Sequence, residues 1–167
     1  MMPHSDPSAS IHSMDEFEAM DRSVEVLIVD SNACNDLSIT RLDVSSFKCL
    51  RVFKVGDCSF AYVKELKLVE LKKLERVVIG MNCFSKDISS GHFSLKNCRQ
   101  VKELKMGRYS FLGYSVCEIE NDDSLEVIGI GELDKQINNS YWSDSALKSC
   151  YFYGSDCALR SCCDGMK

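Results

Sequence analysis

Proline, glycine, tryptophan and long hydrophobic runs are all scarce in this chain of 167 residues. It has two prolines, both within the first seven residues, nine glycines and one tryptophan. This composition excludes collagen-like and proline-rich low-complexity structures. The longest aliphatic runs, such as 26–29 and 77–79, are far shorter than the roughly 20 residues that a membrane-spanning helix requires. We therefore expect no transmembrane segment.

The N-terminal segment points to a reducing compartment, and this decides how the cysteines are interpreted. The first twenty residues lack both the positive start and the apolar core of a secretory signal, so we expect a cytoplasmic protein. We expect its ten cysteines to be mainly buried thiols rather than a disulfide framework. The group of Cys150, Cys157, Cys162 and Cys163 has no C-x-x-C spacing, which argues against a zinc site. Cys162 and Cys163 would be open to oxidation if they were exposed.

Residues for catalysis and cofactor binding are also few. Of three histidines, His4 and His12 lie in an acidic N-terminal region, and we place His92 in a polar loop. Nucleophilic catalysis requires a base within hydrogen-bonding reach of a serine or cysteine, and this distribution indicates no such pair. The segment 129–131 has two of the glycines of a phosphate-binding loop but lacks the third. We expect no enzymatic activity, no metal and no cofactor.

One pattern recurs six times along the chain: apolar-x-x-apolar-x-apolar, followed five positions later by phenylalanine or cysteine. Its copies start 26, 24, 27, 24 and 22 residues apart. We call the last position the aromatic column; the fifth copy has Lys135 there. The matching residues are Val24, Leu27, Val29 and Cys34; Leu50, Phe53, Val55 and Phe60; Leu74, Val77, Ile79 and Phe84; Val101, Leu104, Met106 and Phe111; Leu125, Ile128 and Ile130; Leu147, Cys150, Phe152 and Cys157.

A second apolar pattern precedes each new copy. Its members are Leu42, Val44 and Phe47; Leu66, Leu68 and Leu71; Phe93, Leu95 and Cys98; Cys117, Ile119 and Asp122. Alternating apolar positions indicate short strands, so each repeat is predicted to hold two strands and no helix. Glycine follows the first strand at positions 56, 80, 107 and 131, where we expect a turn with positive φ. One repeat buries too little to be stable alone, so the copies are predicted to stack.

Charges support this stacking independently of the apolar pattern. The position after each repeat start alternates in sign through all six copies: Glu25, Arg51, Glu75, Lys102, Glu126 and Lys148. Opposite charges on neighbouring strands attract, whereas like charges repel. The alternation therefore predicts that equivalent residues of successive repeats lie side by side.

Segments such as LRVFKVGDCSF, LERVVIGMNCF and VKELKMGRYSF resemble leucine-rich repeats, particularly the divergent BspA-like type. The asparagine position of ordinary leucine-rich repeats holds only Asn32 and Asn82, with Cys58, Tyr109, Leu133 and Ser155 in the other copies. We therefore expect a flatter, β-rich solenoid of about six coils with two short parallel sheets and little helix. The resemblance implies a recognition surface without catalysis.

The chain divides into three parts in this interpretation. Residues 1–23 form an acidic tail or a short helical cap, residues 24–160 form the solenoid with degenerate fifth and sixth coils, and residues 161–167 form a tail. The 133–146 loop holds the single tryptophan, Trp142, either as an exposed contact or as a plug. An uncapped C-terminal coil would leave a bare sheet edge, which predicts continuation of the chain, end-to-end self-association or aggregation.

Charge is segregated along the sequence. Residues 1–36 hold eight acidic residues and one basic residue, residues 37–110 hold seven and fifteen, and residues 111–167 hold ten and four, which sum to the net charge of −5. Two positions before each repeat start stands a basic column. Its members are Arg22, Lys48, Lys72 and Arg99, followed by Asp123 and Ser145.

The basic column is the candidate partner-binding site. We expect Arg22, Lys48, Lys72 and Arg99, helped by Lys54, Lys67 and Lys105, to bind an acidic segment of a protein partner. The alternative is a turn where long side chains extend into water without binding anything. Nucleic acid is an unlikely partner, because no aromatic residues are interleaved and the acidic ends repel phosphate. The leading function is a non-catalytic protein-binding module; the second is a structural or adhesion-type segment of a longer repeat array.

Overall fold

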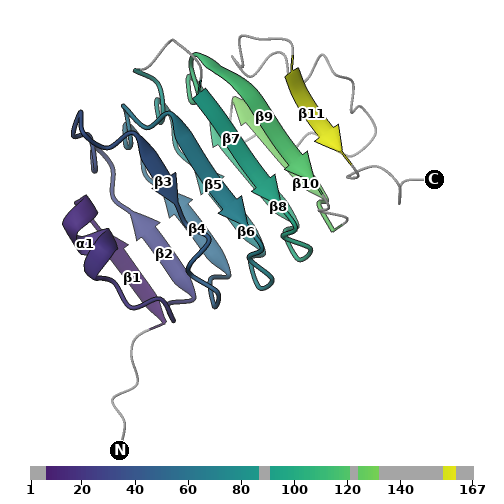
Figure 1. Ribbon diagram of the computed structural model, residues 1–167, viewed down its shortest axis with the longest axis horizontal. Coiled ribbons are helices and arrows are strands. Elements are labelled where there is room, and N and C mark those ends of the chain that lie inside the picture. The colour runs from purple at the N-terminus through teal and green to yellow at the C-terminus, as the bar shows by residue number, and fades with distance from the viewer. Residues whose placement is uncertain (1–6, 87–90, 121–123, 132–155, 161–167) are drawn as a thin grey trace, which may run out of the picture.

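The protein is a parallel β-solenoid of about four turns with two parallel sheets and almost no helix. The computed structural model describes residues 7–86, 91–120, 124–131 and 156–160. The strands of one sheet lie behind those of the other in chain order (Figure 1). The first sheet has the order β1 (Ser8–Ile11), β2 (Val26–Val29), β4 (Val52–Val55), β6 (Arg76–Ile79), β8 (Glu103–Gly107) and β10 (Val127–Gly131). The second has the order β3 (Arg41–Asp43), β5 (Glu65–Val69), β7 (Gly91–Lys96), β9 (Tyr114–Glu120) and β11 (Asp156–Arg160).

The strand register confirms the repeat alignment. Phe53 pairs with Leu27 on one side and with Val77 on the other, and Val77 pairs with Leu104. These side chains are buried, as the apolar pattern predicts. In the second sheet, Leu66, Phe93 and Cys117 pair in the same way. Equivalent residues of successive repeats are therefore direct neighbours, and their inward side chains form a continuous core.

The aromatic column forms a stack inside the solenoid. The ring centroids of Phe60 and Phe84 are 5.6 Å apart, and those of Phe84 and Phe111 are 4.8 Å apart with nearly parallel planes. Tyr114 packs edge-on against Phe111 at 5.0 Å. Offset aromatic contacts of this kind contribute about 0.5–1.5 kcal/mol beyond the burial of the rings. The column fixes the vertical alignment of the turns.

The structural reason for glycine after the first-sheet strands differs from the one expected. None of Gly56, Gly80 and Gly107 has a positive φ, so the prediction of a left-handed glycine turn is wrong. A Cβ at Gly80 would lie 2.4 Å from Asp57 Oδ1 and 2.8 Å from the Asp57 nitrogen, and one at Gly107 would lie 2.5 Å from the Gly80 backbone. Glycine stands there because adjacent turns approach too closely for any side chain.

Positive φ occurs instead at Glu70 and Asn97, which follow second-sheet strands, and at eight residues of the asparagine and aromatic columns, all at values from 53° to 62°. The column residues are Asn32, Cys58, Asn82 and Tyr109, and Cys34, Phe60, Phe84 and Phe111. The left-handed bends turn the backbone so that N–H groups point along the stack. The Cys58 N–H donates to the following turn at 2.8 Å, and the Phe60 N–H donates to the preceding turn at 3.1 Å. These inter-turn bonds offset the strain of non-glycine residues in the left-handed region.

A buried serine ladder connects the turns just before the aromatic column. Ser110 Oγ accepts a hydrogen bond from the Cys83 N–H at 3.1 Å and donates one to the Gly80 carbonyl at 2.6 Å. Ser59 makes the equivalent bonds to the turn before it, at 3.1 and 2.7 Å. Cys83, between them in the stack, donates its thiol to a backbone carbonyl at 3.1 Å. These side chains satisfy backbone groups that lie too deep for water to reach.

The N-terminal segment contains a strand that the repeat pattern does not predict. β1 pairs with β2 in parallel and extends the first sheet. It is followed by the helix α1 (Met14–Ala19), whose N-cap residue Ser13 accepts from the Glu16 N–H at 3.3 Å. Phe17 of this helix is buried with its ring centroid 5.2 Å from that of Phe47. The helix thus covers the end of the core beside the first turn (Figure 1).

The C-terminal part differs from a six-coil solenoid. β10 continues the first sheet, as the fifth copy predicts. Cys157, expected in the aromatic column, lies instead on β11, opposite Cys117 of the second sheet. The second apolar pattern is lost at 139–144, and Asp156–Arg160 supplies the next second-sheet strand in its place. The 133–146 loop with Trp142, the 161–167 tail and the sixth copy up to residue 155 lie outside the described residues.

Candidate functional site

Three members of the predicted basic column lie together at one corner of the solenoid. Lys48, Lys72 and Arg99 are exposed and occupy the corners that lead from a second-sheet strand to the next first-sheet strand in successive turns. The Lys48 ammonium donates to the Glu70 carbonyl, one turn further on, at 3.3 Å. Stacked turns are about 4.8 Å apart, so the three residues span roughly 10 Å.

Arg22 does not belong to this surface. Its guanidinium donates to the carbonyls of Phe17 and Glu18 at 2.8 and 3.2 Å, at the C-terminal end of α1. It also lies over the ring of Phe47, with 4.4 Å from its central carbon to the ring centroid. Carbonyls at the end of a helix have no partner within the helix, and a cation there is favourable. Arg22 therefore fastens the N-terminal helix to the first turn.

The three supporting lysines lie on other faces. Lys54 and Lys105 are on the outer face of the first sheet, and Lys67 is on the outer face of the second. Lys105 and Lys67 are paired with carboxylates on their own strands, Glu103 at 2.6 Å and Glu65 at 2.8 Å. The structure thus separates the seven predicted residues into a corner group of three, a half-buried arginine beside α1 and three lysines on the sheet faces.

Two exposed lysines that the column pattern misses join the corner group. Lys73 directly follows Lys72, and Lys102 follows Val101 in the next turn. We call Lys48, Lys72, Lys73, Arg99 and Lys102 the basic corner. Lys102 is itself a member of the alternating charge column and lies three positions after Arg99. Its place at the same corner as Arg99 could therefore have been predicted from the sequence. Nothing in the column spacing indicates Lys73.

The alternating charge column also lies beside this corner. Arg51 forms ion pairs with Glu75 at 3.1 Å and with Glu25 at 3.7 Å, in the turns on either side. The hydrogen bond and charge of Glu75 raise the pKa of the Arg51 guanidinium above its ordinary value. The predicted sign alternation is confirmed for these three turns. Glu25 and Glu75 are thus engaged with Arg51.

A second charged group lies on the outer face of the second sheet. His92, which the sequence placed in a polar loop, stands on β7. Its Nε2 is 3.0 Å from a carboxylate oxygen of Glu118 and 3.1 Å from Ser94 Oγ, and Lys96 pairs with the same carboxylate oxygen at 2.6 Å. The hydrogen bonds of Lys96, then of His92, lower the pKa of Glu118.

These residues resemble a catalytic serine, base and acid in composition but not in connectivity. A relay requires the serine and the acid to contact different nitrogens of the imidazole. Here Ser94 and Glu118 both contact Nε2 of His92, and Ser94 is within 3.5 Å of the Glu118 carboxylate directly. The contacts are those of a cross-strand ion-pair network, which stabilises parallel strands.

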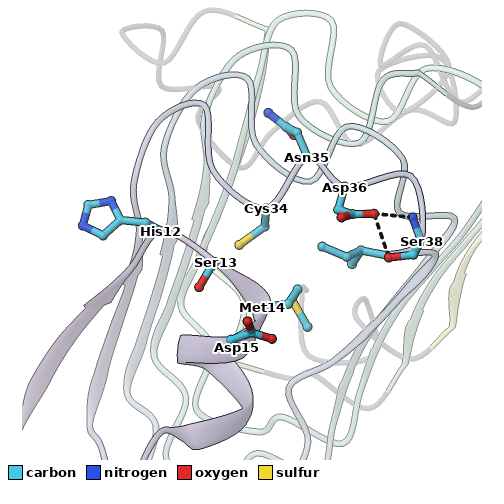
Figure 2. Close-up of a pocket in the computed structure, with 9 residues that line it drawn as sticks. His12, Ser13, Met14, Asp15, Cys34, Asn35, Asp36 and Ser38 are labelled. Atoms are coloured by element: carbon cyan, nitrogen blue, oxygen red, sulfur yellow. Dashed lines mark hydrogen bonds between the residues drawn. The ribbon is translucent and has the colours of Figure 1, made fainter.

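A cavity of about 330 Å³ opens between α1 and the loop that follows β2 (Figure 2). Its lining residues are His12, Ser13, Met14, Asp15, Cys34, Asn35, Asp36, Ser38 and Ile39. Cys34 stands where later turns have phenylalanine. Burial, with a smaller effect from the charge of Glu16, raises the pKa of its thiol to about 11. Sequence reasoning assigned Cys34 to the core and did not predict an opening beside it.

Metal and membrane features are absent from the described ranges. No group of three or more histidine, cysteine, aspartate or glutamate residues there is arranged to hold a metal ion. No helix among the same residues has the length and apolar character needed to cross a bilayer. Comparison with protein-family models, curated proteins and solved structures finds no match to this chain. Its classification therefore rests on its own architecture, a parallel β-solenoid of about four turns.

Proposed function

We propose that this solenoid is of the leucine-rich-repeat type and serves as a non-catalytic protein-binding module whose basic corner receives an acidic segment of a partner. The observation that carries the proposal is that most of the positive charges of the basic corner have no partner within the described part of the protein. Among the residues that the structure describes, the side chains of Lys72, Lys73, Arg99 and Lys102 make no hydrogen bond or ion pair, although all four are exposed.

The geometry favours a ligand that runs along the stack. Like charges on adjacent turns, about 4.8 Å apart, repel one another unless they extend into water or meet opposite charges. An extended peptide advances about 3.4 Å per residue, so four or five residues cover the roughly 10 Å from Lys48 to Arg99. Carboxylates on such a segment can reach several basic residues at once. Electrostatic complementarity of this kind accelerates association and makes it sensitive to salt.

The proposal is tested by charge reversal with a charge-matched control. The double variant Lys48→Glu/Lys72→Glu alters the basic corner, while Lys54→Glu/Lys86→Glu changes the net charge equally on exposed residues elsewhere. Binding of a labelled peptide of alternating glutamate and serine is measured by fluorescence anisotropy, and cellular partners are captured by pull-down with mass spectrometry. The corner variant is expected to lose peptide binding and a specific set of captured proteins, and the control is expected to retain both.

The result can contradict the proposal in two ways. Equal binding by the two double variants would show that total charge, not the basic corner, determines the interaction. Capture that is abolished by nuclease treatment would replace the acidic protein with nucleic acid. Circular dichroism of both variants establishes that loss of binding does not reflect unfolding.

A further inference from the structure

We propose that the cavity between α1 and the loop after β2 binds a small aromatic amine. This site is separate from the basic corner, and it does not depend on the function proposed above. The cavity lies beside Cys34, where the later turns have phenylalanine. In the following turns the aromatic column holds Phe60, Phe84 and Phe111, all fully or almost fully buried. A cysteine leaves this rung of the stack without a ring, and the short turn after β1 leads directly into α1.

The floor of the cavity is suited to an aromatic ring. Met14, Cys34 and Ile39 are buried or half-buried and supply its apolar surface. Figure 2 shows the Cys34 and Met14 side chains directed into the space between the helix and the loop. Sulfur atoms make favourable contacts with aromatic rings, which adds to the burial of the ring. The volume of about 330 Å³ is at the lower end for ligand pockets and suits a single-ring molecule.

The rim of the cavity selects for positive charge. Asp15 and Asp36 are both exposed and line the opening. Asp36 accepts from the N–H and hydroxyl of Ser38 through one oxygen, at 2.8 and 2.7 Å, and these bonds lower its pKa, so it stays ionised. Asp15 makes no ion pair with any residue in the described ranges. Two carboxylates at the mouth of a cavity favour an ammonium group over a carboxylate.

The remaining charged groups near the cavity do not cancel this preference. His12 is the only basic residue in its lining, and its ring is paired with Asp30 at 2.6 Å and points away from the other labelled side chains (Figure 2). Glu16 accepts from the His12 N–H at 2.7 Å, and Ser13 accepts from the Glu16 N–H at 3.3 Å. Two N–H donors that could have received an anion at this end of the helix are thereby occupied.

Paired probes of opposite charge test the proposal. Binding of 2-phenylethylammonium is compared with that of 3-phenylpropanoate, an anion of similar size and shape, by isothermal titration and by NMR of the Met14 methyl group. The wild-type protein is expected to bind the ammonium probe and to shift the Met14 signal, with far weaker binding of the anion. Asp15→Asn and Asp36→Asn are each expected to weaken binding about two- to fivefold, and Asp36→Asn keeps an acceptor for Ser38.

A cavity-filling variant and a neutralised control complete the experiment. Cys34→Phe places a ring at this position of the aromatic column and is expected to abolish binding. Phenylalanine is compatible with this left-handed backbone, because Phe60 has φ 53° and Cys34 has φ 56°. Glu18→Gln removes one charge from the same helix outside the cavity lining and is expected to bind as wild type does. Equal binding of the two probes, or unchanged binding after neutralising both aspartates, would overturn the proposal even if Cys34→Phe fails to fold.

Discussion

Removal of one hydroxyl from the serine ladder should destabilise the protein more than removal of most surface side chains. In Ser110→Ala, the Cys83 N–H and the Gly80 carbonyl both lose the partner that they have at 3.1 and 2.6 Å. Ser110 is only 5% exposed, so water cannot easily replace the lost bonds. Each unsatisfied buried group costs about 1–3 kcal/mol, so the two groups together predict a loss of about 2–6 kcal/mol in the free energy of unfolding.

The assay is urea denaturation followed by circular dichroism, together with hydrogen exchange at the Cys83 amide. A loss of this size corresponds to a decrease of roughly 4–24 °C in Tm for a domain of this length. Ser110→Cys should recover part of the stability, because Cys83 occupies the same position of the ladder in the preceding turn and its thiol reaches a carbonyl. Ser46→Ala, at an exposed corner, should change stability by less than about 0.5 kcal/mol. If Ser110→Ala is as mild as Ser46→Ala and leaves exchange at Cys83 unchanged, the ladder does not stabilise the fold.

Three further predictions concern other parts of the solenoid. Gly80→Ala should lower the urea midpoint sharply, because its Cβ would lie 2.8 Å from backbone atoms of the adjacent turn. Gly129→Ala should have a mild effect, because its Cβ would meet only a flexible lysine side chain at 3.2 Å. Equal midpoints for the two variants would contradict the close-approach explanation. The pKa of Glu118 is lowered in the folded state, so its stabilising effect is present above its unfolded value near 4.5 and is lost as the pH falls through the lower folded value. Urea titrations across this range should show a shallower pH dependence for Glu118→Gln, and an unchanged slope would refute that contribution. Burial raises the pKa of the Cys83 thiol to about 12, so mass spectrometry after brief iodoacetamide treatment at neutral pH should show much less alkylation there than at half-buried Cys49, and equal labelling would contradict this.

Sequence periodicity predicted the core because each apolar position is used in the same way in every turn. Leu66, Phe93 and Cys117 differ in size, yet their shared spacing was enough to place them in one row of the second sheet. The glycine turn shows the limit of this reasoning. The spacing correctly placed glycine at a special position. Spacing alone, however, cannot distinguish a residue that requires positive φ from one that has no room for a Cβ atom. The structure shows that Gly80 is of the second kind.

The functional surface was predictable only in part, because position along the repeat does not determine what a side chain contacts outside it. Lys48, Lys72 and Arg99 share a corner as their column predicts. Arg22 has the same column position but contacts a helix that lies before the first repeat, and the repeat pattern contains no information about that helix. The cavity escaped prediction for a similar reason: Cys34 fits the column, and the repeat pattern contains no information about the α1 residues that line the cavity with it.

Parallel pairing of each strand with the strands before and after it has a consequence for communication within the molecule. Each turn of such a stack contacts only the turns before and after it. The effect of a ligand on the stability of a turn should therefore decrease with each turn that separates it from the binding site. An amine held beside Met14 would slow amide exchange in β1 and β2 far more than in β9. An acidic peptide at Arg99 would do the reverse. The cavity and the Arg99 part of the basic corner are therefore suited to binding their ligands independently rather than as an allosteric pair.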